Sequence, residues 1–144
     1  MYENYTKQSL PSRDYRELLG SSLCVFNSNN SFLIENILRY DRDKQTSWYK
    51  LIDNESGKLM KYISKIIEGD LGLKVADKFK KLVSKRNRII HSFQITDQDG
   101  KQCLATKDRE HKQFVISKEY LLDFIKENES FSNLMYKVRE QFNS

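Results

Sequence analysis

The sequence LKVADKFKKLVSKRNRIIHSF, residues 73–93, decides which kind of fold this chain can form. Its apolar residues recur every three or four positions for about six turns of an α-helix. They are Val75, Phe79, Leu82, Val83, Ile90 and Phe93. Because residues at this spacing share one face of a helix, the stretch predicts a long amphipathic helix with one side in a core. The same segment carries seven basic residues against a single acidic residue, Asp77, so the helix is basic as well as amphipathic.

Upstream of this helix the pattern predicts shorter helical pieces. A first helix should begin near Pro11, since proline suits the first turn of a helix. We expect it to end at residues 27–30, whose asparagine and serine side chains compete with the backbone for hydrogen bonds. The apolar stretches at 32–38 and 48–52 then form two short helices or one bent helix.

Two further helices are predicted on either side of the basic one. Residues 56–68 have apolar side chains at helical spacing, and Gly69 and Gly72 should end that helix, since glycine is common just past a helix C-terminus. The last helix should begin after Ser117, a good N-cap residue, with a break near residues 129–130.

Between the basic helix and the last helix, the helical spacing gives way to short stretches of apolar and β-branched residues. These stretches are 93–96, 102–106 and 113–116, separated by turn-forming segments at 97–100 and 107–110. Together they predict a small β-hairpin insert at about residues 94–116. The fold class that follows is mainly α: a bundle of about four to five helices, forming a single domain over residues 1–144, with the β insert before the last helix.

Composition limits the classes of function. The 144 residues include 25 Lys and Arg against 20 Asp and Glu, a net charge of +5 that favours polyanionic partners without requiring them. Cys24 and Cys103 match no metal-ligand spacing, which predicts reduced thiols and no metal. No apolar run approaches the roughly twenty residues of a membrane span, and the first residues do not read as a signal peptide. We expect a cytoplasmic protein without a cofactor or membrane association.

The end of the basic helix gathers the residues best suited to chemistry: Arg86, Asn87 and His91. An imidazole transfers protons near neutral pH and a guanidinium binds phosphate through two parallel hydrogen bonds, which suits cleavage of a phosphodiester. At about 100° per residue, Asn87 and His91 share a face, whereas Arg86 lies about 140° from His91 inside the apolar stripe. A charge there needs a partner, an interface or a ligand. Glu68 and Asp70 are possible partners, and a two-fold dimer would bring two copies of the motif around one cleft.

The spacing Arg86-Asn87-x-x-x-His91 resembles the R-x4–6-H motif of the HEPN superfamily (higher eukaryote and prokaryote nucleotide-binding domains), including the polar residue after the arginine. The resemblance implies a compact helical bundle, commonly dimeric, and a metal-independent endoribonuclease of toxin–antitoxin, phage-defence or RNA-processing systems. It further implies attack of the ribose 2′-hydroxyl on the adjacent phosphate, with His91 as general base or acid, Arg86 on the phosphate and Asn87 orienting either group. An antitoxin or other regulatory protein is then an expected partner besides RNA.

Four other basic residues of the same helix are candidates for binding the RNA backbone: Lys78, Lys81, Lys85 and Arg88. They would supply affinity without sequence preference. Two other functions remain open. A catalytically inactive HEPN-like dimer would serve as an adaptor or as a nucleotide- or nucleic-acid-binding module, and a DNA-binding protein would use the basic helix as a recognition helix. His111, in a charged loop, is expected to be exposed and to have no role.

Overall fold

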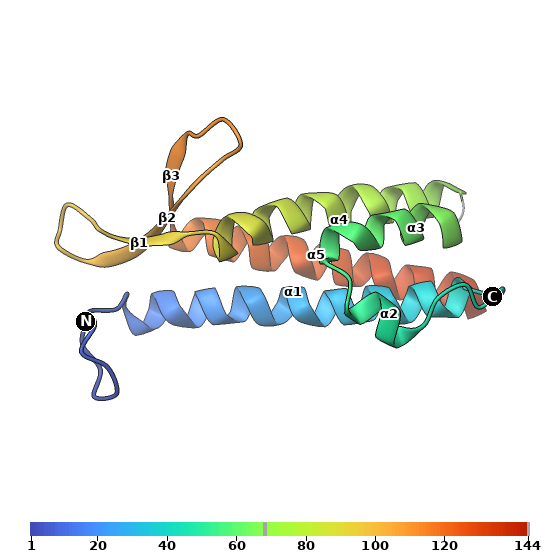
Figure 1. The fold of residues 1–144 in the computed structure, drawn as a ribbon, viewed down its shortest axis with the longest axis horizontal. Coiled ribbons are helices and arrows are strands. Elements are labelled where there is room, and N and C mark those ends of the chain that lie inside the picture. Colours follow the sequence, from blue (N-terminus) through green and yellow to red (C-terminus); the bar gives the residue numbers. More distant parts are fainter. Residues whose placement is uncertain (68, 144) are drawn as a thin grey trace.

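The structure is a computed structural model that describes residues 1–67 and 69–143. These residues form a helical bundle with a small antiparallel sheet at one end (Figure 1). In chain order the elements are α1 (Arg13–Tyr40), α2 (Trp48–Ile52), the 3-10 helix η1 (Ser56–Leu59), α3 (Met60–Ile66), α4 (Gly69–Ile90), β1 (Phe93–Thr96), β2 (Gln102–Lys107), β3 (Gln113–Ile116) and α5 (Lys118–Asn143). The predicted fold class is confirmed, and the helix predicted at 56–68 is η1 followed by α3.

Helix α1 continues through residues 27–30, so the predicted interruption there is wrong. The asparagines do not compete with the backbone of their own helix, because their side chains bond to other elements. Asn29 Nδ2 donates to the main-chain oxygen of Asn128 at 2.7 Å and to its side-chain oxygen at 3.1 Å. Asn30 Oδ1 accepts from Ser56 Oγ at 3.0 Å. The apolar residues that follow are therefore the second half of α1, and α2 is a separate short helix.

Helices α1 and α5 run parallel along the length of the bundle (Figure 1). Side chains at every seventh position of α1 donate hydrogen bonds to main-chain carbonyl groups of α5 that lie 99 residues later in the chain. These bonds, which we call the polar ladder, join Ser22 to Leu121 at 3.5 Å, Asn29 to Asn128 at 2.7 Å and Asn36 to Met135 at 3.1 Å. A slip of one helix along the other would leave the buried amides of Asn29 and Asn36 unpaired, so these two members of the polar ladder fix the register. Ser22 Oγ would keep its 2.8 Å hydrogen bond to Leu18 O within α1.

Helix α5 is likewise continuous where a break was predicted, at residues 129–130. Packing secures the helix on both sides of that point, since Phe124 and Phe131 are fully buried. Asn128 Nδ2 also donates to Phe124 O at 2.9 Å within the helix. Residues 129–130 are exposed, so their polar side chains disturb neither the core nor the backbone.

Four phenylalanines from three helices form the centre of the core. Phe26 of α1 lies 6.0 Å from Phe79 of α4 and 6.2 Å from Phe124 of α5, measured between ring centroids. Phe131 of α5 lies 5.6 Å from Phe79. Helix α4 thus packs against both α1 and α5, and it runs antiparallel to them (Figure 1). Its inner face is therefore fixed by aromatic packing.

Helix α4 is the predicted basic helix, but it begins and ends earlier than residues 73–93. Gly69 and Gly72 open α4 instead of ending α3. A Cβ atom added to Gly72 would lie 1.8 Å from the carbonyl oxygen of Ile67, so the close approach of the two helices requires glycine there. Ile90 and Phe93 were predicted in the core and are instead 51% and 41% exposed, because the helix ends at Ile90 and the chain leaves the bundle.

The three β stretches predicted from the sequence are all strands, and they form an antiparallel sheet in the order β1-β2-β3 rather than a two-stranded hairpin. Asp97 and Asp108 shape the two turns, since Oδ1 of each accepts hydrogen bonds from two main-chain N–H groups. Tyr15 joins the sheet to α1: its hydroxyl donates to Ile116 O at 2.6 Å and accepts from Leu104 N at 3.2 Å.

The last helix begins as predicted, because Ser117 Oγ accepts a hydrogen bond from Tyr120 N at 3.0 Å. The sheet therefore leads directly into a capped helix. Across residues 1–67 and 69–143, no helix combines the length and apolar character needed to cross a membrane.

Candidate active site

Arg86 lies on the inner face of α4, in line with its position in the apolar stripe. Its guanidinium carbon is 4.9 Å from the centre of the Phe26 ring, at the edge of the aromatic core. Its Nε donates to Asn87 Oδ1 at 3.1 Å. A guanidinium that stacks on a ring and is bonded at Nε has its plane fixed, while its two terminal nitrogens keep four donor hydrogens.

The charge of Arg86 has no acidic partner within the described part of the chain. Burial lowers the pKa of Arg86 because desolvation penalises the charged form, and the negative charge of Glu55 acts in the opposite direction. No ion pair involving Arg86 forms among residues 1–67 and 69–143. Asp70 is exposed, and Glu68 lies outside the described residues. Arg86 is therefore a partly desolvated cation whose partners in the described structure are an aromatic ring and a neutral amide.

Asn87 links the two other residues of the motif through different atoms. Its side-chain oxygen accepts from Arg86 Nε, and its main-chain oxygen accepts from His91 N at 2.9 Å. The amide therefore orients the guanidinium directly. The sequence predicted an orienting role for Asn87 toward His91 or the phosphate, and the structure adds this contact with Arg86.

His91 is the first residue after α4 and is exposed. Ser92 Oγ donates to Ile89 O at 2.6 Å, which closes the end of the helix behind it. The imidazole makes no hydrogen bond with Arg86 or Asn87 within the described structure. A single chain thus brings Arg86 and Asn87 together, whereas His91, four residues after Asn87, lies about 140° around the helix axis from Arg86.

The four predicted RNA-binding residues lie on the outer side of α4 and on its side toward α5. Each makes a contact within the chain: Lys78 with Ser130 Oγ at 3.2 Å, Lys81 with Asp77 at 3.5 Å, Lys85 with Glu127, and Arg88 with the main-chain oxygen of Lys107. Lys81 is exposed and the other three side chains are half-buried, so all four reach the solvent and are available to a polyanion.

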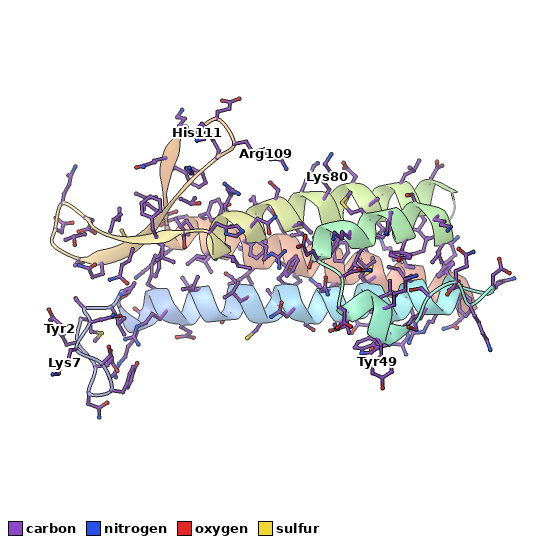
Figure 2. All side chains as sticks on the ribbon, in the orientation of Figure 1. Tyr2, Lys7, Tyr49, Lys80, Arg109 and His111 are labelled. Atoms are coloured by element: carbon purple, nitrogen blue, oxygen red, sulfur yellow. The ribbon has the colours of Figure 1, made fainter. Side chains whose placement is uncertain are left out.

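Two adjoining cavities run along this side of α4. The first has a volume of about 480 Å³ and lies between α4 and α5. The second has a volume of about 400 Å³, lies between α4 and the β2–β3 turn, and is lined by Asn87 and Arg109 among others. Ser84 and Lys85 line both cavities, so the two lie side by side along α4. Figure 2 shows Arg109 and His111 at the tip of the turn that bounds the second cavity.

The sequence did not indicate three residues of the second cavity: Arg109, Phe114 and Tyr120. The rings of Phe114 and Tyr120 lie 5.8 Å apart at an interplanar angle of 50°. Lys85 Nζ lies 5.4 Å from the centre of the Tyr120 ring. These residues come from the β2–β3 turn, from β3 and from the start of α5, so only the folded sheet and the packing of α5 on α4 bring them together. The one available signal was the run of charge at residues 107–112.

The described part of the chain offers few other reactive or metal-binding groups. Cys24 and Cys103 are free thiols. No group of three or more His, Cys, Asp or Glu side chains within residues 1–67 and 69–143 is arranged to hold a metal ion. No family model, curated protein or solved structure matches the chain.

Proposed function

We propose that the chain is a metal-independent endoribonuclease of HEPN type, which cleaves RNA by attack of a ribose 2′-hydroxyl with His91 and Arg86 at a dimer cleft. The observation that carries the proposal is the state of Arg86. Its guanidinium is partly desolvated, stacked on Phe26 and fixed by Asn87, without an ion-pair partner in the described structure. An RNA phosphate is the partner that this geometry lacks, because its oxygens accept two parallel hydrogen bonds from a guanidinium.

The chemistry follows from the two side chains. Removing the proton of the 2′-hydroxyl lets its oxygen attack the adjacent phosphorus, and the 5′-oxygen leaves with a proton. His91 supplies one of these proton transfers, since an imidazole side chain can act as a general base or a general acid. Arg86 neutralises the charge that grows on the phosphoryl oxygens. The products are a 2′,3′-cyclic phosphate and a 5′-hydroxyl.

The dimer cleft is part of the proposal because one chain holds Arg86 and His91 on different sides of α4. A second copy would present its own His91 to the phosphate bound by Arg86, or supply the second proton transfer. Ile90 and Phe93 flank His91 in sequence and are 51% and 41% exposed. Apolar side chains of this size beside the motif favour a surface that another protein chain covers.

The biological setting follows only from the resemblance of the motif. A ribonuclease of this kind would act as a toxin or a phage-defence component in the cytoplasm, with an antitoxin or another regulatory protein restraining it. The surface around Ile90 and Phe93 is a candidate contact for such a partner as well.

A catalytically inactive HEPN-like dimer is the second candidate, and one observation favours it. Arg86 is engaged by Phe26 and Asn87, and it makes no contact with His91 in the single chain. A domain that had lost catalysis could keep such an arginine for packing alone. This candidate predicts a dimer that binds a nucleotide, nucleic acid or protein without cleaving RNA.

Cleavage of labelled RNA in EDTA, with analysis of the new ends, tests the proposal. We expect the parent to leave cyclic-phosphate ends, and His91→Ala and Arg86→Lys to cleave at least about 100-fold more slowly. His111→Ala and Arg139→Lys are matched controls, since they change the other histidine and an exposed arginine of α5 that lines neither cavity. Equal rates in His91→Ala and His111→Ala would refute the assigned roles. A parent that dimerises but does not cleave would favour the inactive module.

A further inference from the structure

The two adjoining cavities on the α5 side of α4 have features that the proposed catalytic residues do not use. We propose that together they form a track for single-stranded RNA, in which Phe114 and Tyr120 provide a stacking platform for one unpaired base. This inference rests on the proposed ribonuclease function and deepens it by naming the kind of RNA that the site takes. We call the set Lys78, Lys81, Lys85, Arg88 and Arg109 the basic track.

The spacing of the basic track suits a nucleic-acid backbone. Its α4 members follow one another at intervals of three, four and three residues, which keeps them along one side of the helix. From Lys78 to Arg88 the helix rises about 15 Å, at about 1.5 Å per residue. A stacked strand advances about 3.4 Å per nucleotide, so this length matches about four nucleotides. Arg109 extends the track onto the β2–β3 turn (Figure 2).

The aromatic pair gives the track a preference for unpaired bases. Phe114 and Tyr120 both line the second cavity and are half-buried, with ring centroids 5.8 Å apart. Every base has a π-face that can stack on such a surface, so the platform tolerates any sequence. In a duplex those faces are already covered by neighbouring bases, and the platform cannot reach them. Lys85 Nζ lies over the Tyr120 ring, 5.4 Å from its centre, so a base that stacks on this face displaces the cation toward the adjoining phosphate.

Asn87 connects this track to the proposed catalytic arginine. Its side chain lines the second cavity, and its Oδ1 accepts from Arg86 Nε at 3.1 Å. A strand lying in the track would therefore pass the residue that orients Arg86. The position of the track explains how RNA is guided to the motif from the side of α4 that Arg86 does not occupy.

Acidic residues in the same cavities limit the affinity. They are Glu127 in the first cavity and Asp108 and Glu110 in the second. Glu127 forms an ion pair with Lys85, so an incoming phosphate has to displace its carboxylate. Asp108 is tied to the turn, where Oδ1 accepts from the main-chain N–H groups of Glu110 and Lys112. Neutralising Glu127 should consequently strengthen RNA binding, an effect that a purely structural role would not give.

The first experiment measures binding of a fluorescent single-stranded RNA of about 12 nucleotides by anisotropy, in EDTA and in a His91→Ala background. Lys81→Glu should weaken binding about tenfold and make it less dependent on salt. Lys80→Glu is the matched control: this exposed lysine is the neighbour of Lys81 on α4 and lines neither cavity (Figure 2). It should change binding about twofold or less. Equal losses in the two variants would mean that the protein attracts RNA by net charge alone, which overturns the track.

Two further variants test the details on proteins whose thermal unfolding matches the parent. Glu127→Gln should tighten binding about fivefold, whereas Glu129→Gln, an exposed change on the same helix, should not. Phe114→Leu should weaken single-stranded RNA about tenfold and leave the weaker binding of duplex RNA unchanged. Equal binding of single-stranded and duplex RNA by the parent, or no effect of Phe114→Leu, would overturn the stacking platform.

RNA binding and RNA cleavage are measured in separate assays, so the results can support the track without the ribonuclease function, or the reverse. Binding with the expected variant pattern but no cleavage by the parent would remove the ribonuclease function and keep the track. Cleavage by the parent, with Lys81→Glu and Phe114→Leu binding and cleaving as well as the parent does, would keep the ribonuclease and remove the track.

Discussion

Arg86→Met should abolish RNA cleavage while leaving the fold as stable as the parent. The change removes a hydrogen bond to Asn87, worth about 1 kcal/mol, and a cation–π contact with Phe26, worth about 0.5–1 kcal/mol. Methionine restores part of this loss, since a thioether beside an aromatic ring contributes about 0.3–1.5 kcal/mol. It also removes the cost of desolvating a charge that has no ion-pair partner in the described structure. Replacing a buried ion pair by apolar residues is often neutral or stabilising, by about 1–4 kcal/mol, and we expect the lower end of that range for a single half-buried cation.

These contributions nearly cancel, so we expect the free energy of unfolding of Arg86→Met to lie within about 1 kcal/mol of the parent or above it. Urea denaturation followed by far-UV circular dichroism measures this directly, with Arg88→Met as the control for losing a surface arginine. Removing one partner of a structural buried ion pair costs about 3–5 kcal/mol. A loss of that size in Arg86→Met would show that the arginine holds the fold together, and the reasoning that assigns it to a phosphate would be refuted.

Three further predictions concern the fold. Burial raises the pKa of Tyr15 above its ordinary value of 10.0, so its neutral form stabilises the fold below that pH and this contribution is lost as pH rises through the raised pKa. Tyr15→Phe should therefore lose less unfolding free energy than the parent between about pH 9 and 11, and equal losses in urea titrations would contradict this. Gly72→Ala should lower the free energy of unfolding by more than about 2 kcal/mol, because the new methyl group clashes with the end of α3. Gly20→Ala, with open space around it, should raise the free energy of unfolding by about 0.5–1 kcal/mol. Shifts of the melting temperature in the same direction for both variants would refute the contrast. Asn29→Ala should lower the free energy of unfolding by about 2 kcal/mol, because it breaks the polar ladder, and the change of exposed Asn27 to Ala should leave it almost unchanged. Similar denaturation midpoints for the two variants would show that the polar ladder does not stabilise the fold.

Local patterns predicted those elements whose stability is decided by their own residues. The apolar period of α4 and the short strands between it and α5 are confirmed because each needs only one buried face or one turn-forming segment. The predicted end of the first helix is wrong because the partner of Asn29 lies 99 residues away, on α5. No window of sequence contains both residues. Gly72 was misread for a related reason, since its role is set by contact with Ile67 at the end of another helix.

Some features of the candidate site follow from the local sequence, and others depend on the tertiary fold. The position of Arg86 in the apolar stripe and the placing of His91 on another side of α4 follow from helical geometry alone. The contact of Arg86 with Phe26 does not, because the sequence cannot say which helix covers that stripe. Arg109 comes beside α4 on the β2–β3 turn, and Tyr120 comes there through the packing of α5 against α4. Catalytic roles and the dimer stay predictions until cleavage and oligomeric state are measured.

The parallel pairing of α1 with α5 sets a minimum time for folding during synthesis. At about 5–20 residues per second, a ribosome takes about 5–20 s to make the 99 residues that separate each pair of the polar ladder. During that interval α1 has no α5 to cover its inner face. Ser22, Asn29 and Asn36 break up the apolar surface of the waiting helix, so the residues that later fix the register also reduce its tendency to aggregate. If the chain is a nuclease, it cannot become active before α5 has been made.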